Sequence, residues 1–313
     1  MQCNLCGSGN NEIISEYTRL ERNNILRCSD CGLVFLDLKK PKEEEESVYT
    51  KEYREADTLP KISAEEWFTN PVIIQDCKNR MEWISKRYGD VSGKRILDIG
   101  CSSGYFLKTL FSANANASGV ELNESCSDYA RSLGFTVYSK NIETLGFKNE
   151  FDLVVMFHTL EHVFDPMAAL RAIHTSLKRG GVFMGEVPNQ DDWRIKIFNN
   201  EVVKRFHYDP FHYYYFSPKT FTEYLKKSMF DNIRLETVEK YNSLTQLRRI
   251  LRGEYNEKYV DIILKQDIFA KPEEDVRIHH PDNYQETEFN RMFEKGADSM
   301  LMGNCLRWMA TKR

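Results

Sequence analysis

The chain has 313 residues, of which 41% are apolar and 29% charged, and its formal net charge at pH 7 is −4. This balance argues against nucleic acid as a partner, because proteins that grip long nucleic acids usually carry a basic excess. No apolar run approaches the roughly 18 residues that a membrane span requires, and the first residues lack the basic start and apolar run of a signal peptide. We therefore expect a cytoplasmic, soluble globular protein without a membrane span.

Two Cys-x-x-Cys-Gly motifs lie near the start of the chain, with 21 residues between them. The glycine after each pair lets the backbone turn so that its amides face the thiolates. Four thiolates suit a closed, tetrahedral, structural zinc site. We therefore predict a zinc ribbon over residues 1–36. The expected zinc ligands are Cys3, Cys6, Cys28 and Cys31.

Residues 37–92 are expected to connect the ribbon to the rest of the chain. Residues 37–62 are rich in Glu, Lys and Pro, which is typical of a solvated connector. Residues 63–88 show helical spacing of apolar side chains, with a break or restart at Pro71. We interpret the whole segment as a linker followed by an N-terminal helical cap.

From residue 94 onward, strand-like and helix-like segments alternate. The expected strands are 95–99, 117–122, 136–139, 151–157, 181–187, 232–238 and 304–311, and the expected helices are 105–112, 124–133, 166–177 and 218–228. Alternation of this kind predicts an α/β fold, with a doubly wound, mostly parallel, seven-stranded sheet. The core would comprise residues 93–240 and 301–313. Residues 241–300 would form a helical insertion before the last strand, placed to act as a substrate lid.

A glycine loop follows the first strand of this core and opens a helix. Gly100 and Gly104 give it the spacing Gly-x-x-x-Gly, and Asp98 precedes the first glycine. Glycines allow a ligand to approach the main chain, and the helix N-terminus offers free N–H groups. Glu121 ends the second strand about 20 residues later, where an acidic side chain can accept hydrogen bonds from ribose hydroxyls.

As a set, four motifs in order resemble those of the class I S-adenosylmethionine-dependent methyltransferases. They are the first motif at 97–104, the acidic second motif at 120–122, the fourth strand at 151–155 and the turn at 177–181. The resemblance implies a Rossmann-like fold and an enzyme that uses S-adenosylmethionine. The glycine spacing disagrees with a dinucleotide-binding dehydrogenase.

Carried over by position, the resemblance assigns the cofactor contacts. Gly100 and Gly104 would lie against the methionine part, Asp98 would organise the loop, and Glu121 would hold the ribose. Leu122, Asn141 and Ile142 would flank the adenine. The full expected set is Asp98, Gly100, Cys101, Ser102, Gly104, Glu121, Leu122, Asn141, Ile142, Phe157 and His158.

The segment after the fourth strand carries His158, Glu161 and His162, where the family places residues facing the acceptor. Three interpretations remain open. Glu161 and His162 could be structural, holding the loop by hydrogen bonds. The group of three could bind a divalent metal, with His212 as a further ligand. One of its members could act as a general base, a role that suits histidine because its pKa lies near neutrality.

His212 lies in the aromatic segment 206–218, ahead of Tyr-Phe-Ser. This position resembles that of the catalytic histidine in nucleotide-sugar C-methyltransferases. That group carries Tyr-His-Glu-His where this chain has Asp-Pro-Phe-His at 209–212. Since C-methylation needs a base strong enough to form an enolate, the departure favours O-methylation. We also expect Ser217 to cap the helix that begins at Pro218.

The leading hypothesis is methyl transfer to a small-molecule hydroxyl on a sugar, nucleotide-sugar or glycan. The candidate catalytic residues are His212, His158, Glu161 and His162. The ribbon and the segment 241–300 would shape the acceptor pocket. The alternatives are a zinc-ribbon methyltransferase of ribosomal or transfer RNA, a sugar C-methyltransferase, and a non-catalytic scaffold. The acidic tilt of the ribbon opposes the RNA hypothesis, and the intact glycine loop opposes a scaffold.

The four cysteines outside the ribbon are not expected to bind metal. Cys101 occupies a position in the glycine loop where a small residue is needed. Cys77, Cys126 and Cys305 are expected to face the core.

Overall fold

The computed structural model describes residues 2–19, 21–38, 63–198, 203, 204, 207–240, 247, 250 and 288–313. The chain divides into two compact units. Unit 1 comprises Met1–Pro60, Val187–Phe221 and Leu235–Arg307, and unit 2 comprises Lys61–Glu186, Thr222–Arg234 and Trp308–Arg313. The chain therefore enters each unit more than once.

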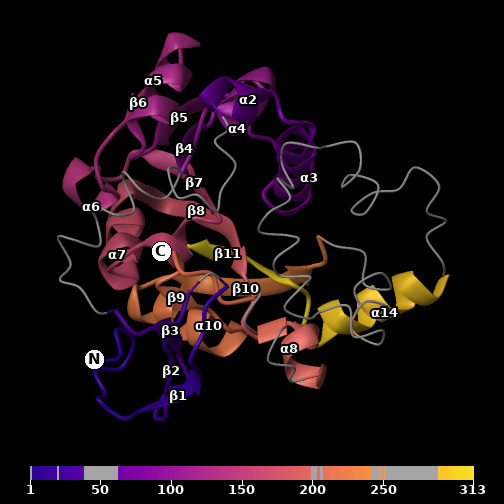
Figure 1. The fold of residues 1–313 in the computed structure, drawn as a ribbon. Helices are drawn as coiled ribbons and strands as arrows, with labels where there is room; N and C mark the ends of the chain where they lie inside the picture. The colour runs from indigo at the N-terminus through magenta and orange to yellow at the C-terminus, as the bar shows by residue number, and fades with distance from the viewer. Residues whose placement is uncertain are drawn as a thin grey trace. The chain divides into compact units, whose positions relative to one another are not determined.

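The predicted seven-stranded sheet is confirmed (Figure 1), with the strand order β10-β11-β8-β7-β4-β5-β6. Its strands are β4 (Arg95–Ile99), β5 (Asn116–Val120), β6 (Val137–Tyr138), β7 (Phe151–Phe157), β8 (Leu177–Pro188), β10 (Asp231–Val238) and β11 (Cys305–Thr311). The pairs from β8 through β7, β4 and β5 to β6 are parallel. Strands β8, β10 and β11 have residues in both units.

The predicted helices are present, and a short further helix, Ile142–Leu145, follows β6. They are α2 (Ala64–Thr69), α3 (Pro71–Arg87), α4 (Tyr105–Ser112), α5 (Glu124–Ser132), α6 (Ile142–Leu145), α7 (Pro166–Ser176) and α10 (Pro218–Lys227). The helix restarts at Pro71 for a local reason. The Asn70 side chain accepts a hydrogen bond from the Val72 N–H, and the N–H that proline lacks would have no partner within the helix at this first position. Ser63 caps α2 in a capping box with Glu66.

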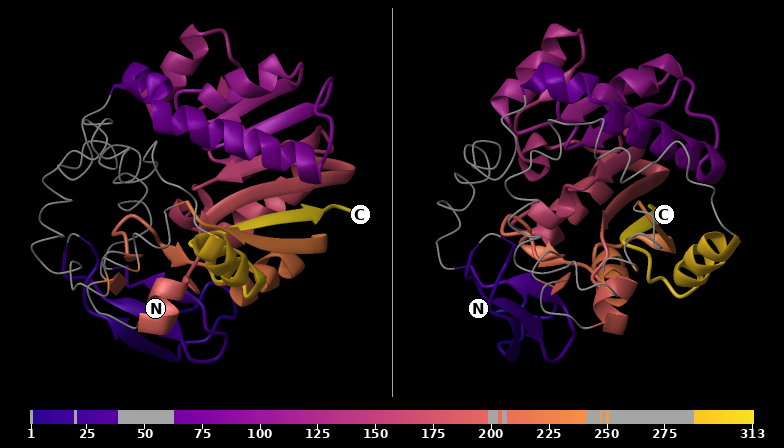
Figure 2. Two further views of the ribbon diagram at one scale, coloured as in Figure 1. Left: turned by 90° about the vertical axis from the view of Figure 1, so that its right-hand side faces the viewer. Right: turned by 45° about the vertical axis from the view of Figure 1, so that its right-hand side comes forward.

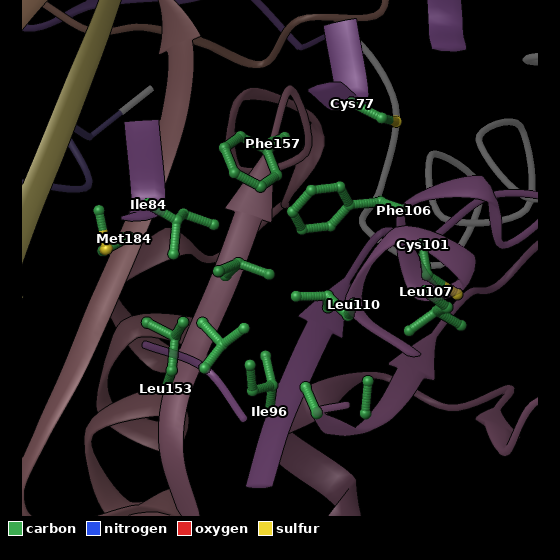
Figure 3. Packing of buried hydrophobic residues seen from close by; sticks show 14 of the residues in the cluster. Cys77, Ile84, Ile96, Cys101, Phe106, Leu107, Leu110, Leu153, Phe157 and Met184 are labelled. Carbon is green, nitrogen blue, oxygen red and sulfur yellow. The ribbon is translucent and has the colours of Figure 1, made fainter. Parts of the chain in front are cut away.

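Both faces of the sheet are buried in unit 2. On one face, side chains from β4 and β7 pack against α3 and α4 (Figure 3). Neighbouring residues point to opposite faces of a strand, and the adjacent pairs Ile96–Leu97 and Leu153–Val154 are all fully buried. Burial of both faces is the signature of a parallel sheet covered on two sides, so the doubly wound prediction is confirmed.

Three of the lone cysteines lie where the sequence predicts. Cys77, Cys126 and Cys305 are buried. The fourth, Cys101, is also buried, and a Cβ on Gly119 would lie 2.3 Å from its sulfur atom. A small residue is therefore required on both sides of that contact.

Unit 1 contains a second, four-stranded sheet with the order β1-β2-β3-β9. The strands are β1 (Asn11–Ser15), β2 (Ile25–Cys28), β3 (Val34–Leu36) and β9 (Tyr214–Tyr215), and all neighbours are antiparallel. Unit 1 also includes α8 (Trp193–Phe198) and α14 (Glu288–Ser299), the latter shown in yellow (Figure 2). The ribbon is therefore not a separate sheet, since a strand from the aromatic segment 206–218 extends it.

Two predicted strand boundaries were wrong by more than one residue. The strand expected at 117–122 ends at Val120, because the side chain of Asn123 accepts a hydrogen bond from Cys126 N and starts α5. The strand expected at 181–187 begins at Leu177, which pairs with Phe151 ahead of a register shift. The glycine turn before it is therefore part of an irregular strand.

Part of the predicted insertion at 241–300 falls within the described residues. Its last portion forms α14, which agrees with a helical insertion before the last strand. The helical spacing predicted over 245–270 lies outside the described residues, apart from positions 247 and 250. Among the helices that the structure describes, none has the length and apolar character needed to cross a membrane.

Candidate active site

The expected cofactor residues of unit 2 gather at one edge of the sheet. Ile99 pairs with Val120 on β5 and with Met156 on β7, and Val120 pairs with Tyr138 on β6. In a parallel sheet this register brings the carboxyl ends of neighbouring strands to a common edge, where ligands of such folds bind. The residues that follow these strands, Gly100 and Glu121 among them, therefore share that edge.

The Thr159 side chain approaches the glycine loop too closely for any side chain at the first glycine of the loop. Gly100 has φ +77°, and a Cβ there would lie 2.1 Å from Oγ1 of Thr159. Gly104 has φ +88° and directly precedes α4. Ser102 also adopts positive φ, at +50°. The loop is thus held in a tight left-handed turn against the segment that follows β7.

Glu121 braces the same loop from β5. Its Oε2 accepts a hydrogen bond from Ser102 N at 2.9 Å, and its Oε1 accepts one from Asn123 N at 2.8 Å. A carboxylate has about four acceptor positions, so two remain for hydroxyl donors. The residue expected to bind ribose therefore also sets the conformation of the loop, a role that its sequence position did not indicate.

A buried ionic cluster lies beneath the loop. Burial raises the pKa of Asp98 to about 7, although the nearby Arg80 guanidinium opposes the shift. Arg80 comes from α3, with its guanidinium 4.6 Å from the ring centroid of Phe157 and 4.0 Å from Oε1 of Glu186. Burial would lower the pKa of Arg80, but the charge of Glu186 contributes to a net rise. The cation is therefore retained inside the site.

His158 lies between two buried carboxylates at the end of β7. Its Nε2 is 2.7 Å from Oε1 of Glu186, and its Nδ1 is 3.4 Å from Oε1 of Glu161. The His158 side chain is 29% exposed, whereas the two carboxylates are 0% and 2% exposed. With φ +47°, His158 is also a non-glycine residue in the left-handed region. Such strain concentrates at functional positions.

Glu161 and His162 lie in a short 3₁₀ helix, η1 (Leu160–His162), and both are buried. Two backbone hydrogen bonds close this turn, from His162 N to Thr159 O and from Val163 N to Leu160 O. Glu161 therefore reaches His158 within a tight local turn, and the short helix holds their contact.

The remaining expected cofactor contacts occupy varied positions. Ile142 is buried and Asn141 is exposed at the start of α6, while Leu122 is partly exposed after β5. Cys101 is buried towards Gly119. Phe157 is buried in the core cluster (Figure 3).

His212 belongs to unit 1. Its backbone N–H donates to Asp209 O at 3.1 Å, and its ring centroid lies 5.9 Å from that of Tyr215. The segment is tied to the ribbon, because Arg19 forms an ion pair with Asp209 at 3.3 Å and Leu36 N donates to Tyr213 O. The catalytic role of His212 stays a prediction.

The expected cap of α10 is confirmed within unit 1. Ser217 Oγ accepts a hydrogen bond from Thr220 N at 3.2 Å, and Thr220 Oγ1 accepts one from Ser217 N at 3.0 Å. This reciprocal pair satisfies two backbone donors at the start of the helix.

The four ribbon cysteines converge in unit 1. The Sγ atoms of Cys3 and Cys31 are 3.5 Å apart, as are those of Cys6 and Cys28, and all four lie within 4.8 Å of one another. A zinc–sulfur bond of about 2.3 Å gives tetrahedral sulfur–sulfur distances of about 3.8 Å. The cluster therefore fits a tetrahedral metal site.

The backbone of the two knuckles is nearly identical. Gly7 N donates to Cys3 O at 2.8 Å, and Gly32 N donates to Cys28 O at 2.9 Å. Both glycines have positive φ, +79° and +84°. Burial raises the pKa of Cys3 to about 11, whereas backbone N–H groups outweigh burial and lower the pKa of Cys28 to about 7.

Arg80 and Glu186 were missed by the sequence reasoning, although each left a signal. Arg80 lies three residues after Cys77 and three before Trp83, on the buried face of its helix. Glu186 is an acidic residue inside the apolar strand β8. Charged residues are rarely buried unless they are paired or serve a function. Both residues could therefore have been named as candidate site residues from the sequence.

Comparison with protein families identifies the class. A family model described as a methyltransferase domain matches residues 75–235, about half of the chain. The protein belongs to this methyltransferase-domain family, and the predicted relationship to class I S-adenosylmethionine-dependent methyltransferases is confirmed.

Individual relatives are similar over a shorter stretch. The chain is 34% identical over 117 residues to the ubiquinone biosynthesis O-methyltransferase of Pseudomonas aeruginosa (strain UCBPP-PA14), covering 34% of this chain and 50% of that protein. It is 33% identical over 110 residues to the protein of the same name from Bordetella avium (strain 197N), covering 33% and 46%. The chain thus spans about half the length of the curated relatives it matches.

Among solved structures, phosphoethanolamine N-methyltransferase 2 of Haemonchus contortus, in complex with S-adenosyl-L-methionine, is similar with a TM-score of 0.52. The identity is 19%, and the match covers 89% of this chain and 62% of that chain. At this identity the likeness shows the fold alone.

Proposed function

We propose that this protein is an S-adenosylmethionine-dependent O-methyltransferase that acts on a hydroxyl of a small molecule. One observation carries the proposal: the glycine loop and Glu121 lie at the carboxyl ends of adjacent parallel strands. Family membership supports methyl transfer, and the names of the relatives support O-methylation.

The residues present fit the cofactor. Gly100 keeps the loop tight, because a Cβ there would overlap the Thr159 side chain, and Glu121 keeps acceptor capacity for ribose hydroxyls. Asp98, Ser102 and Gly104 would complete the contacts on the methionine side. Leu122, Asn141 and Ile142 would flank the adenine.

S-adenosylmethionine, when bound, supplies an electrophilic methyl group. The protein must then align the acceptor oxygen, exclude water and take the hydroxyl proton. His158 is our candidate for the proton acceptor. The next residue, Thr159, closely approaches Gly100, so the histidine stands beside the glycine loop. His212 remains a second candidate, on the resemblance of its surrounding residues.

For the acceptor, we favour a hydroxyl of a sugar, nucleotide-sugar or glycan. The support is the sequence around His212 and its departure from the C-methyltransferase motif. A precursor in ubiquinone biosynthesis is the other class that the relatives' names suggest. Incubation with S-adenosylmethionine and panels of both classes, read by mass spectrometry for a gain of one CH₂, separates them. Products from the second panel alone would overturn our choice.

We further propose that Cys3, Cys6, Cys28 and Cys31 bind structural zinc. The support is their tetrahedral spacing and the matched knuckle turns. The metal would stabilise a small sheet in unit 1.

Isothermal titration calorimetry with S-adenosylmethionine tests the cofactor proposal. Gly100→Ala should weaken binding at least tenfold, because the added Cβ would overlap the Thr159 side chain and displace the loop. Gly134→Ala is the matched control, since Gly134 also has positive φ, at +90°, but nothing lies within 4 Å of its Cβ position. Absence of binding to the wild-type protein, or equal losses in both variants, would refute the proposal.

A further inference from the structure

His158 is held by contacts that differ sharply between its two ring nitrogens. The 2.7 Å distance from Nε2 to Glu186 Oε1 requires a shared proton. The 3.4 Å distance from Nδ1 to Glu161 Oε1 lies beyond the usual range of an N–H···O hydrogen bond. A neutral imidazole carries one proton, so the short contact decides which nitrogen holds it.

Arg80 decides on which side of the short contact that proton lies. The guanidinium is 4.0 Å from Oε1 of Glu186, the same oxygen that faces His158. A nearby cation favours the ionised carboxylate. Glu186 is therefore an acceptor, and Nε2 is the donor.

The backbone fixes the same geometry. Phe157 pairs in register with Glu186, and His158 N donates to Glu186 O at 2.8 Å. At Gly185 an added Cβ would lie 2.1 Å from Met156 O and 2.3 Å from Trp308, so β8 approaches β7 as closely as a glycine permits. The backbone position of Glu186 is thus fixed relative to His158.

We propose that Glu186, held ionised by Arg80, is a positioning residue that fixes the Nε2–H tautomer of His158 and leaves Nδ1 as the proton-accepting atom. This inference rests on the proposed function of His158 as the base. In the reaction, the acceptor oxygen forms a bond to the methyl carbon, and the carbon–sulfur bond breaks with its electron pair going to sulfur. The hydroxyl proton passes to Nδ1, where Glu161 stabilises the resulting cation.

Nitrogen-15 NMR of the histidine ring in the full chain tests the tautomer without cofactor or acceptor. The chain has 7 histidines, and a His158→Gln variant assigns the signal. The wild-type protein should show His158 as Nε2–H in its neutral form. Glu186→Gln should let the Nδ1–H form become at least equally populated, because an amide oxygen attracts the proton less strongly than a carboxylate does. The His174 signals serve as an internal control.

Two further variants keep the test decisive if Glu186→Gln folds poorly. Arg80→Gln should produce the same change, and Glu186→Asp should retain the Nε2–H preference. An unchanged tautomer in Glu186→Gln or Arg80→Gln, with native circular dichroism, would overturn the proposal.

Once an acceptor is known, Glu186→Gln should lower kcat at least about twofold with little change in KM, because no more than half of the His158 rings would then have an unprotonated Nδ1. Failure of S-adenosylmethionine to bind would defeat the proposed function while leaving the tautomer result intact. The two failures are therefore distinguishable.

Discussion

Buried charges dominate the site at the scale of single residues. Asp98, Arg80 and Glu186 lie in the interior of unit 2, where an unpaired charge would be costly. The attraction between these opposite charges offsets part of the cost of burial. The part that is not offset raises the pKa of Asp98. Such clusters stabilise a fold less than an apolar core would, so their presence points to function.

The pKa of Asp98 predicts a pH-dependent stability. Burial raises it from 3.8 to about 7, so between these values the unfolded chain releases a proton that the folded chain keeps. Stability from this group is therefore complete below pH 3.8 and is lost as the pH rises through 7. Each pKa unit corresponds to about 1.4 kcal/mol, so the effect is measurable.

Asp98→Asn should remove this dependence. Urea unfolding of the cofactor-free protein at several pH values should show the variant gaining on the wild-type protein as the pH rises. Asp128→Asn, at a side chain 75% exposed, is the control and should show no such gain. A difference between Asp98→Asn and wild type that is independent of pH would contradict the assignment.

At the scale of secondary-structure elements, two short elements position the candidate residues. The 3₁₀ turn η1 places Glu161 against His158, and β9 joins the aromatic segment to the ribbon. Neither element has a strong sequence signal, because each is only two or three residues long. Their conformations follow from the longer elements on either side.

Zinc removal tests the ribbon sheet. A chelator, or Cys28→Ser, should abolish hydrogen-exchange protection in β1, β2 and β3, since these strands are too short to persist alone. Protection in β9 should fall as well, because its partner is β3. Cys126→Ala, at a buried cysteine of unit 2, should keep one zinc per chain. Full protection in a metal-free chain would rule out a structural metal.

At the scale of the whole molecule, each of the two units is built from three separate segments of the chain. Three strands of the large sheet have residues in both units, so the units are not consecutive domains. The ribbon predicted over residues 1–36 lies in the same compact unit as residues 187–221. In unit 2, the ligand edge is set by strand register over the full width of the parallel sheet.

Hydrogen exchange with S-adenosylmethionine should map that edge. Segments 98–104, 119–123 and 157–162 should gain protection, because they lie at the carboxyl ends of their strands. The amino-terminal ends of β4 and β7 should not change, which provides a control within the same strands. Protection spread evenly along β4 and β7 would indicate general stabilisation in place of a site at this edge.

Much of the fold could be predicted because its signals are local. The bounds of β4, α4 and β7 match the sequence predictions, since apolar runs and the glycine turn mark their ends. The candidate residues Asp98, Gly100 and Glu121 lie together as predicted, because strand order and parallel register follow from the fold class.

The sequence by itself determined the cysteine knuckles, the glycine loop and the alternation that defines a doubly wound sheet. Only the tertiary structure showed that Glu186 meets His158 from 28 residues away, that Arg80 reaches Glu186 from α3, and that β9 completes the ribbon sheet. The physical reason is the separation along the chain between the residues that interact. Turns, caps and periodicity depend on neighbours in the chain, whereas charge pairing and strand register between distant segments depend on how the whole core packs.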